Sequence, residues 1–79
     1  MLDKVRDFFN SQYNDLVRAI TCRRQGNGYQ WMTEREFVDR TITDCLAVAQ
    51  FSQTIGVPYA EVNELYEKLK AMCEALLED

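Results

Sequence analysis

Three glutamates near the carboxyl end have the residue type and spacing that acid–base chemistry can use. Glu61, Glu64 and Glu67 recur at every third position, so a helix would carry them along one side. Paired carboxylates act as acid and base only where a pocket separates their pKa values, and three short helices leave little room for such a pocket. We therefore expect a solvated acidic face that can contact a basic partner.

The other residues that commonly carry chemistry are absent or badly spaced. The chain has no histidine, which is the commonest general base and metal ligand. Its three cysteines, Cys22, Cys45 and Cys73, lie too far apart for the paired spacing of a zinc site. Cys22 precedes two arginines that can lower a thiol pKa, but a free cysteine more often behaves as a small hydrophobe. We predict no catalytic residue, metal or cofactor, and no enzyme.

The size and charge of the chain predict one small acidic domain, residues 1–79. The net charge is -4, and the excess negative charge lies in the last third of the sequence. Charged residues interrupt the apolar residues of the first ten positions, so we expect neither a signal peptide nor a membrane span. An odd number of widely spaced cysteines does not suggest a disulfide framework. These features predict a cytoplasmic protein.

Three amphipathic segments account for almost the whole chain, at about residues 3–25, 33–55 and 58–77. Their apolar residues recur at steps of three and four, as one face of a helix requires. Antiparallel packing would bring the three faces together, so the sequence predicts an all-α, antiparallel three-helix bundle. The predicted core comprises Val5, Phe9, Leu16, Ile20, Val38, Ile42, Cys45, Ala49, Val62, Leu65, Leu69, Met72 and Leu76.

Local signals mark the ends of these helices. Thr33 followed by Glu36 has the spacing of a capping box and predicts the start of the second helix. Gly26 and Gly56 can take the left-handed conformation that ends a helix. Pro58 is tolerated in the first turn of the third helix, because its missing N–H is not needed there.

The second helix carries an additional apolar stripe that the core of a three-helix bundle does not need. This stripe includes Phe37, Val48, Phe51 and Ile55. It belongs either to a wide central core or to a surface for another chain. A chain this short buries only about 60% of its unfolded surface, so a second copy would stabilise it. We predict a homodimer through Val48, Phe51 and Ile55.

Residues 48–66 resemble the helix-turn-helix motif. The small residue of its first helix corresponds to Ser52, the turn glycine to Gly56, and an apolar anchor of its second helix to Val62. The resemblance covers a quarter of the chain and implies a helix-turn-helix-like corner between the second and third helices. It also implies a DNA-binding transcriptional regulator. The helix that would enter the major groove presents Glu61 and Glu64 first, which phosphates repel, so DNA binding is the alternative function.

The segment between the first two helices combines arginines with aromatic residues. Arg23 and Arg24 end the first helix, and Tyr29 and Trp31 lie in the irregular stretch of residues 26–32. Trp31 can cap the end of the core. Alternatively, it can contact a partner together with the arginines, since Trp, Tyr and Arg dominate binding hot spots.

These observations favour a non-enzymatic protein-interaction module that acts by binding a larger protein, as an adaptor or an inhibitor. The residues predicted to contact the partner are Arg23, Arg24, Tyr29, Trp31, Glu61, Glu64 and Glu67. Small helical domains of this kind are frequent among phage and mobile-element proteins, and such an origin is a further hypothesis.

Overall fold

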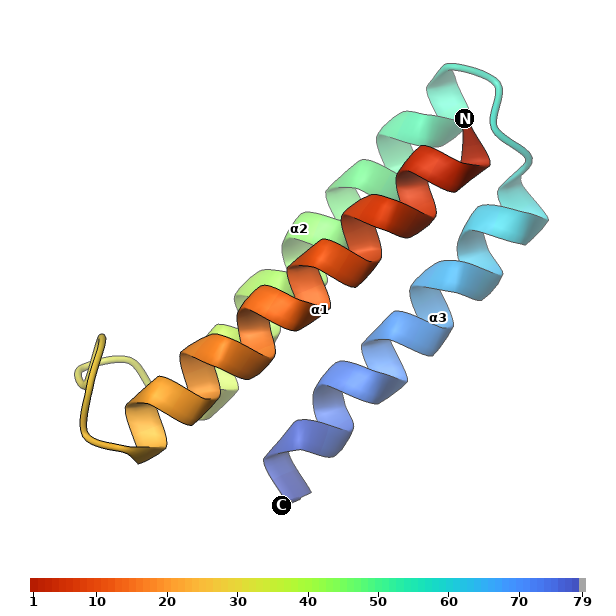
Figure 1. Ribbon diagram of the computed structural model, residues 1–79. Helices are drawn as coiled ribbons and strands as arrows, with labels where there is room; N and C mark the ends of the chain where they lie inside the picture. Colours follow the sequence, from red (N-terminus) through yellow and green to blue (C-terminus); the bar gives the residue numbers. More distant parts are fainter. Residues whose placement is uncertain (79) are drawn as a thin grey trace.

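The computed structural model describes residues 1–78, which form three helices packed against one another (Figure 1). Helix α1 spans Leu2–Arg24, α2 spans Glu34–Thr54 and α3 spans Tyr59–Ala75, and a short 3-10 turn, η1 (Leu76–Glu78), follows α3. These bounds lie within two residues of the predicted ones. No strand occurs among residues 1–78, and the predicted all-α three-helix bundle is confirmed.

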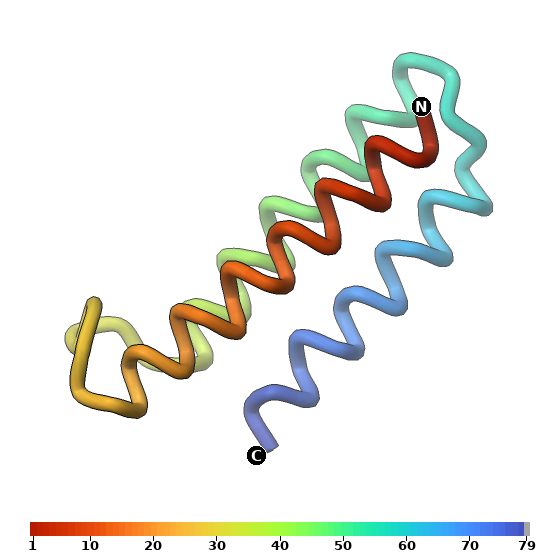
Figure 2. Tube along the Cα trace, viewed as in Figure 1, coloured from red at the N-terminus to blue at the C-terminus, as the bar shows by residue number. Residues whose placement is uncertain are grey.

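The helices run antiparallel in chain order and form a rod of 43 × 19 × 17 Å. Figure 2 shows the start of α1 beside the connection from α2 to α3. We call this the corner end of the rod. The connection from α1 to α2 lies at the opposite end, together with the end of α3, and we call this the loop end. Helix α3 returns alongside its two neighbours, so the corner joins an antiparallel pair of helices.

The start of α2 is fixed by the predicted capping box. The Thr33 hydroxyl accepts a hydrogen bond from the backbone N–H of Glu36 at 3.0 Å, and the Glu36 carboxylate accepts one from the backbone N–H of Thr33 at 3.2 Å. Two of the N–H groups that a helix start leaves unpaired are thereby satisfied.

Helices α1 and α2 end by the same device. At the end of α2 the N–H of Val57 donates to Ser52 O at 3.0 Å and that of Gly56 to Gln53 O at 3.2 Å. This pair of bonds defines a Schellman motif, which needs the positive φ of 94° that Gly56 adopts. An equivalent pair of bonds ends α1, where Gly26 has a φ of 84°. Pro58 lies at the N-cap position of α3, one residue before the first turn where it was predicted.

The core is one continuous cluster that draws on all three helices. Val38, Cys45, Val62 and Cys73 are fully buried. Every predicted core residue is buried in this cluster or partly buried against it except Met72, whose side chain is 47% exposed. The prediction for Met72 was wrong.

The error arises from a rotation of α3 about its own axis. The buried residues of this helix are Val62, Tyr66, Leu69 and Cys73, which step by four, three and four residues. The predicted stripe stepped by three first, through Leu65. Both series have helical periodicity, because apolar residues occupy neighbouring positions in each turn. Packing against α1 and α2 together turns Tyr66 and Cys73 inward.

Candidate functional site

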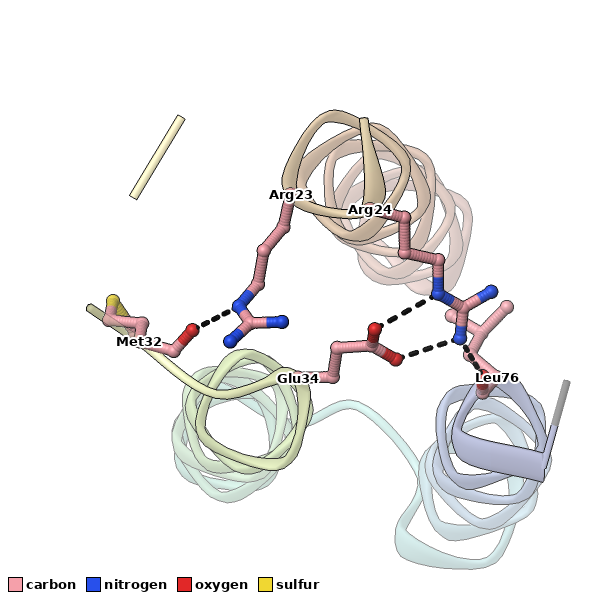
Figure 3. A network of polar contacts seen from close by, with 5 residues as sticks. All are labelled: Arg23, Arg24, Met32, Glu34 and Leu76. Carbon is pink, nitrogen blue, oxygen red and sulfur yellow. Dashed lines mark hydrogen bonds and ion pairs between the residues drawn. The ribbon is translucent and has the colours of Figure 1, made fainter. Parts of the chain in front are cut away.

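A charged network closes the loop end of the bundle (Figure 3). Nη2 of Arg24 donates to Oε1 of Glu34 at 2.7 Å, and Nε donates to Oε2 at 3.0 Å. Nη2 also donates to the carbonyl oxygen of Leu76 at 3.1 Å. One side chain from the end of α1 therefore joins the first residue of α2 to the residue that follows α3. The hydrogen bonds from Arg24 hold the pKa of Glu34 below its ordinary value.

The neighbouring arginine holds the loop itself in place. Nε of Arg23 donates to the carbonyl oxygen of Met32, as Figure 3 shows. Met32 is buried to 3% exposure and covers this end of the core, whereas Trp31 is 75% exposed. The cap is therefore Met32, and Trp31 does not take the core-capping position that was one of its two predicted alternatives. Trp31 instead makes an edge-to-face contact with Tyr29, with ring centroids 5.7 Å apart.

The three glutamates singled out in the sequence lie on α3 and are exposed. Glu64 forms an ion pair with Lys68, one turn later, at 3.3 Å. Glu61 and Glu67 lie on the same helix at the solvent-facing positions that the sequence predicted. The loop-end residues and these glutamates occupy different parts of the surface, so the predicted contact residues do not form one patch.

The cysteines are divided between core and surface. Burial raises the pKa of the Cys45 thiol to about 12, and the nearby Cys73 adds to the shift. Burial likewise raises the pKa of Cys73 to about 11. Both thiols therefore stay protonated near neutral pH and act as apolar core groups. Cys22 is exposed near the end of α1.

The second apolar stripe of α2 enters the core only in part, because Phe37 and Val48 pack against the core whereas the other two residues stay exposed. Phe51 is 64% exposed and Ile55 is 49% exposed. Together with Val48, with Phe8 of α1 and with Met1, which precedes α1, they line a shallow hollow of about 190 Å³ at the corner end. We call it the corner hollow. The two other lining residues that bear polar groups are Lys4 and Ser52, whose hydroxyl donates to the carbonyl oxygen of Ala49.

A second hollow, of about 220 Å³, lies between the same two helices toward the loop end. We call it the loop hollow. Ala19, Tyr29 and Phe37 contribute apolar surface, and Asp15, Arg40 and Asp44 contribute charges. No residue of α3 lines either hollow. The two hollows therefore share the side of the bundle formed by α1 and α2, which we call the α1/α2 face.

The sequence had indicated only half of this face. Val48, Phe51 and Ile55 were predicted as a contact surface, and all three line the corner hollow. The contribution of Met1 and Phe8 was missed. The available signal was the width of the apolar stripe on α1, where Phe8 lies beside the buried Phe9.

Comparison of the chain with protein-family models, with curated proteins and with solved structures found no match. Among residues 1–78, no group of three or more histidine, cysteine, aspartate or glutamate side chains is arranged to hold a metal ion. In the same range, no helix has both the length and the apolar character needed to cross a bilayer.

Proposed function

We propose that this protein is a non-enzymatic protein-interaction module, an adaptor or inhibitor that binds a larger protein through the α1/α2 face. The supporting observation is the apolar corner hollow, because Met1, Phe51 and Ile55 stay exposed there and lie outside the core cluster. Contiguous exposed apolar surface on a small domain marks an interaction site. Tyr29 and Trp31 extend the same face toward the loop end.

The chemistry of the titratable groups also supports binding rather than catalysis. Among residues 1–78, the groups with shifted pKa values are two buried thiols and Glu34, whose carboxylate binds Arg24. Burial and one ion pair explain these shifts without a reactive site. Each hollow is smaller than the roughly 300–1,000 Å³ of typical small-molecule pockets. A shallow apolar face of this kind suits the side chains of another protein.

The alternative function, DNA binding through the corner, has weaker support. Recognition helices of helix-turn-helix proteins cross the preceding helix at about 90–120°, whereas α3 lies antiparallel to α2 over its length. Glu61 and Glu64 are exposed at the start of α3, where phosphates would approach. A mobility-shift assay at low salt tests this function. The absence of a shift would exclude it, and a shift specific to one DNA sequence that persists at moderate salt would contradict our assignment.

The proposal is tested by affinity purification from the native cell with two matched variants. Phe51→Glu places a charge in the corner hollow, and Gln50→Glu places the same charge on an exposed position of α2 outside both hollows. We expect one protein to be recovered with the wild type and Gln50→Glu but not with Phe51→Glu. Calorimetry with that purified protein should give a dissociation constant raised at least about 30-fold by Phe51→Glu. Equal binding by both variants would place the contact elsewhere.

A further inference from the structure

We infer that a second copy of the chain, turned end for end, covers the α1/α2 face when no larger protein occupies it. This inference rests on the proposed function, because it names a partner for the same face. It also makes dimerisation and binding of the larger protein mutually exclusive. Three observations carry it: the register of the two hollows, the position of their charges and the area of the face.

The two hollows repeat with the same spacing on both helices. Met1, Lys4 and Phe8 line the corner hollow, and Gln12, Asp15 and Ala19 occupy the loop hollow about three turns further along α1. On α2 the same spacing separates Ile55 from Asp44. A half-turn about an axis across the helices therefore places the corner hollow of one copy over the loop hollow of the other, and the reverse.

This register brings apolar groups together at both ends of the interface. Ile55 of one copy lies beside Phe37 of the second copy, and Met1 lies beside Ala19 of the second copy. The Tyr29–Trp31 pair adjoins the loop hollow, so it reaches the corner end of the second copy. The interface is closed and self-complementary, as a two-fold dimer requires.

The charges on the face favour this end-for-end arrangement. It places Lys4 of each copy opposite Asp15 of the second copy, which creates two attractive pairs. A side-by-side parallel pairing would instead place each hollow over its own counterpart. Two loop hollows would then face each other, each with the carboxylates of Asp15 and Asp44 against the single guanidinium of Arg40. In the end-for-end arrangement Asp44 lies near its own counterpart, and Arg40 lies one turn from Asp44 on the same helix. Charge complementarity of this kind selects the register of an interface.

The face has the area that a specific dimer needs. One side of the rod has an outline of 43 by 19 Å, on the order of 800 Å², which leaves room for the area that each partner contributes to a standard interface. In the register described above, a second copy covers both hollows on this side. A short peptide would cover only one of the two hollows.

The first test measures mass and tryptophan fluorescence against concentration. Trp31 is the single tryptophan and is exposed in one copy, so its emission should shift to shorter wavelength as the dimer forms. Sedimentation equilibrium from about 1 µM to about 1 mM should show twice the 9.3 kDa chain mass at the upper end. Phe51→Glu should raise the dimer dissociation constant at least about 30-fold, with unchanged circular dichroism, and Gln50→Glu should not. A monomer at every concentration would overturn the inference.

The second test exchanges charges across the interface. Lys4→Glu alone and Asp15→Lys alone should each weaken the dimer about tenfold, and the double variant should restore it. Within one copy the two positions are about 16 Å apart along α1, too far for direct compensation. Failure of the double variant to restore the dimer would exclude the end-for-end register.

The third test measures the orientation directly. A spin label on Cys22, the one exposed cysteine of the described residues, should show a distance of about 35–45 Å between copies turned end for end. Parallel copies would give less than about 25 Å and would overturn the inference.

The outcomes separate this inference from the proposed function. A wild-type chain that stays monomeric but binds a larger protein through Phe51 would refute the dimer and keep the proposed function. A dimer that no larger protein displaces, with capture unaffected by Phe51→Glu, would keep the dimer and refute the proposed function.

Discussion

The two ends of the bundle are held together by different kinds of contact. At the loop end, Arg24 binds Glu34 and the carbonyl oxygen of Leu76, so a polar network joins three elements. At the corner end, the side-chain hydrogen bonds of Ser52 and Thr54 stay within α2, and apolar burial joins the helices. Polar partners satisfy one another and complete the loop end. Apolar residues at the corner end exceed what the core needs, and the excess is available for binding.

The largest expected effect comes from placing a charge in the buried part of the corner end. Val57 is buried there, and Val57→Asp should lower the free energy of unfolding by about 3 kcal/mol or more, because an unpaired charge loses its hydration. Chemical denaturation measures the change. Ala60→Asp, at an exposed position in the first turn of α3, is the control and should be nearly neutral. Similar stability of both variants would contradict an apolar corner end.

Replacing the glycine of either Schellman motif should destabilise the two ends of the bundle by similar amounts. Gly26→Ala and Gly56→Ala meet no atom within 4 Å of the added Cβ, so the cost comes from the positive φ alone. We expect each to lower the free energy of unfolding by about 1–2 kcal/mol. Thermal unfolding measures both. A neutral result at either position would show that its Schellman motif is not maintained.

Removing the polar network should affect the loop end moderately. Arg24→Ala should lower the free energy of unfolding by about 1 kcal/mol, since the ion pair is partly exposed and screened. The loss relative to the wild type should shrink at about 1 M salt. Arg18→Ala removes a more exposed ion pair with Asp15 and serves as the control. Equal losses for both arginines, unaffected by salt, would contradict the proposed role of Arg24.

The smallest effect is a dependence on pH that belongs to the loop end. The pKa of Glu34 is lower in the folded state than its ordinary value of 4.5, so the unfolded chain binds a proton more readily. The contribution of Glu34 to stability is therefore present above pH 4.5 and is lost as the pH falls through its folded-state pKa. The difference in unfolding free energy between the wild type and Glu34→Gln should decline in acid, as measured by urea denaturation. The difference between the wild type and Val57→Ala should not change over that interval.

The structural features that could be predicted from the sequence are those set by residues close together along the chain. The capping box of Thr33 and the glycines at 26 and 56 gave the helix ends, because each acts within one turn of the backbone. The inward face of α3 depends on two other helices at once. Apolar residues at both Leu65 and Tyr66 permit two helical stripes, and periodicity alone does not distinguish them.

The residues that α2 contributes to the corner hollow could be predicted from the sequence, but those that α1 contributes could not, because they depend on how the helices pack. Phe51 and Ile55 stood out as surplus apolar residues on α2, but their pairing with Phe8 depends on which side of α1 and α2 is covered by α3. The spacing of apolar residues along the sequence does not show on which side of the α1–α2 pair α3 packs. The ion pair of Arg24 with Glu34 depends on the path of the connecting loop. The sequence suggested Arg24 only as a residue at a helix end and as a contact for the partner.

Because Cys45 and Cys73 are buried, their reactivity toward alkylating reagents reports whether the bundle is folded. In the native bundle an alkylating reagent should add a single mass increment, at Cys22, whereas a denatured chain should acquire three. Counting adducts by mass spectrometry over time would therefore report how often individual molecules open, in a crowded extract as well as in buffer. The same count would show whether a substitution on the α1/α2 face has altered recognition or merely loosened the bundle.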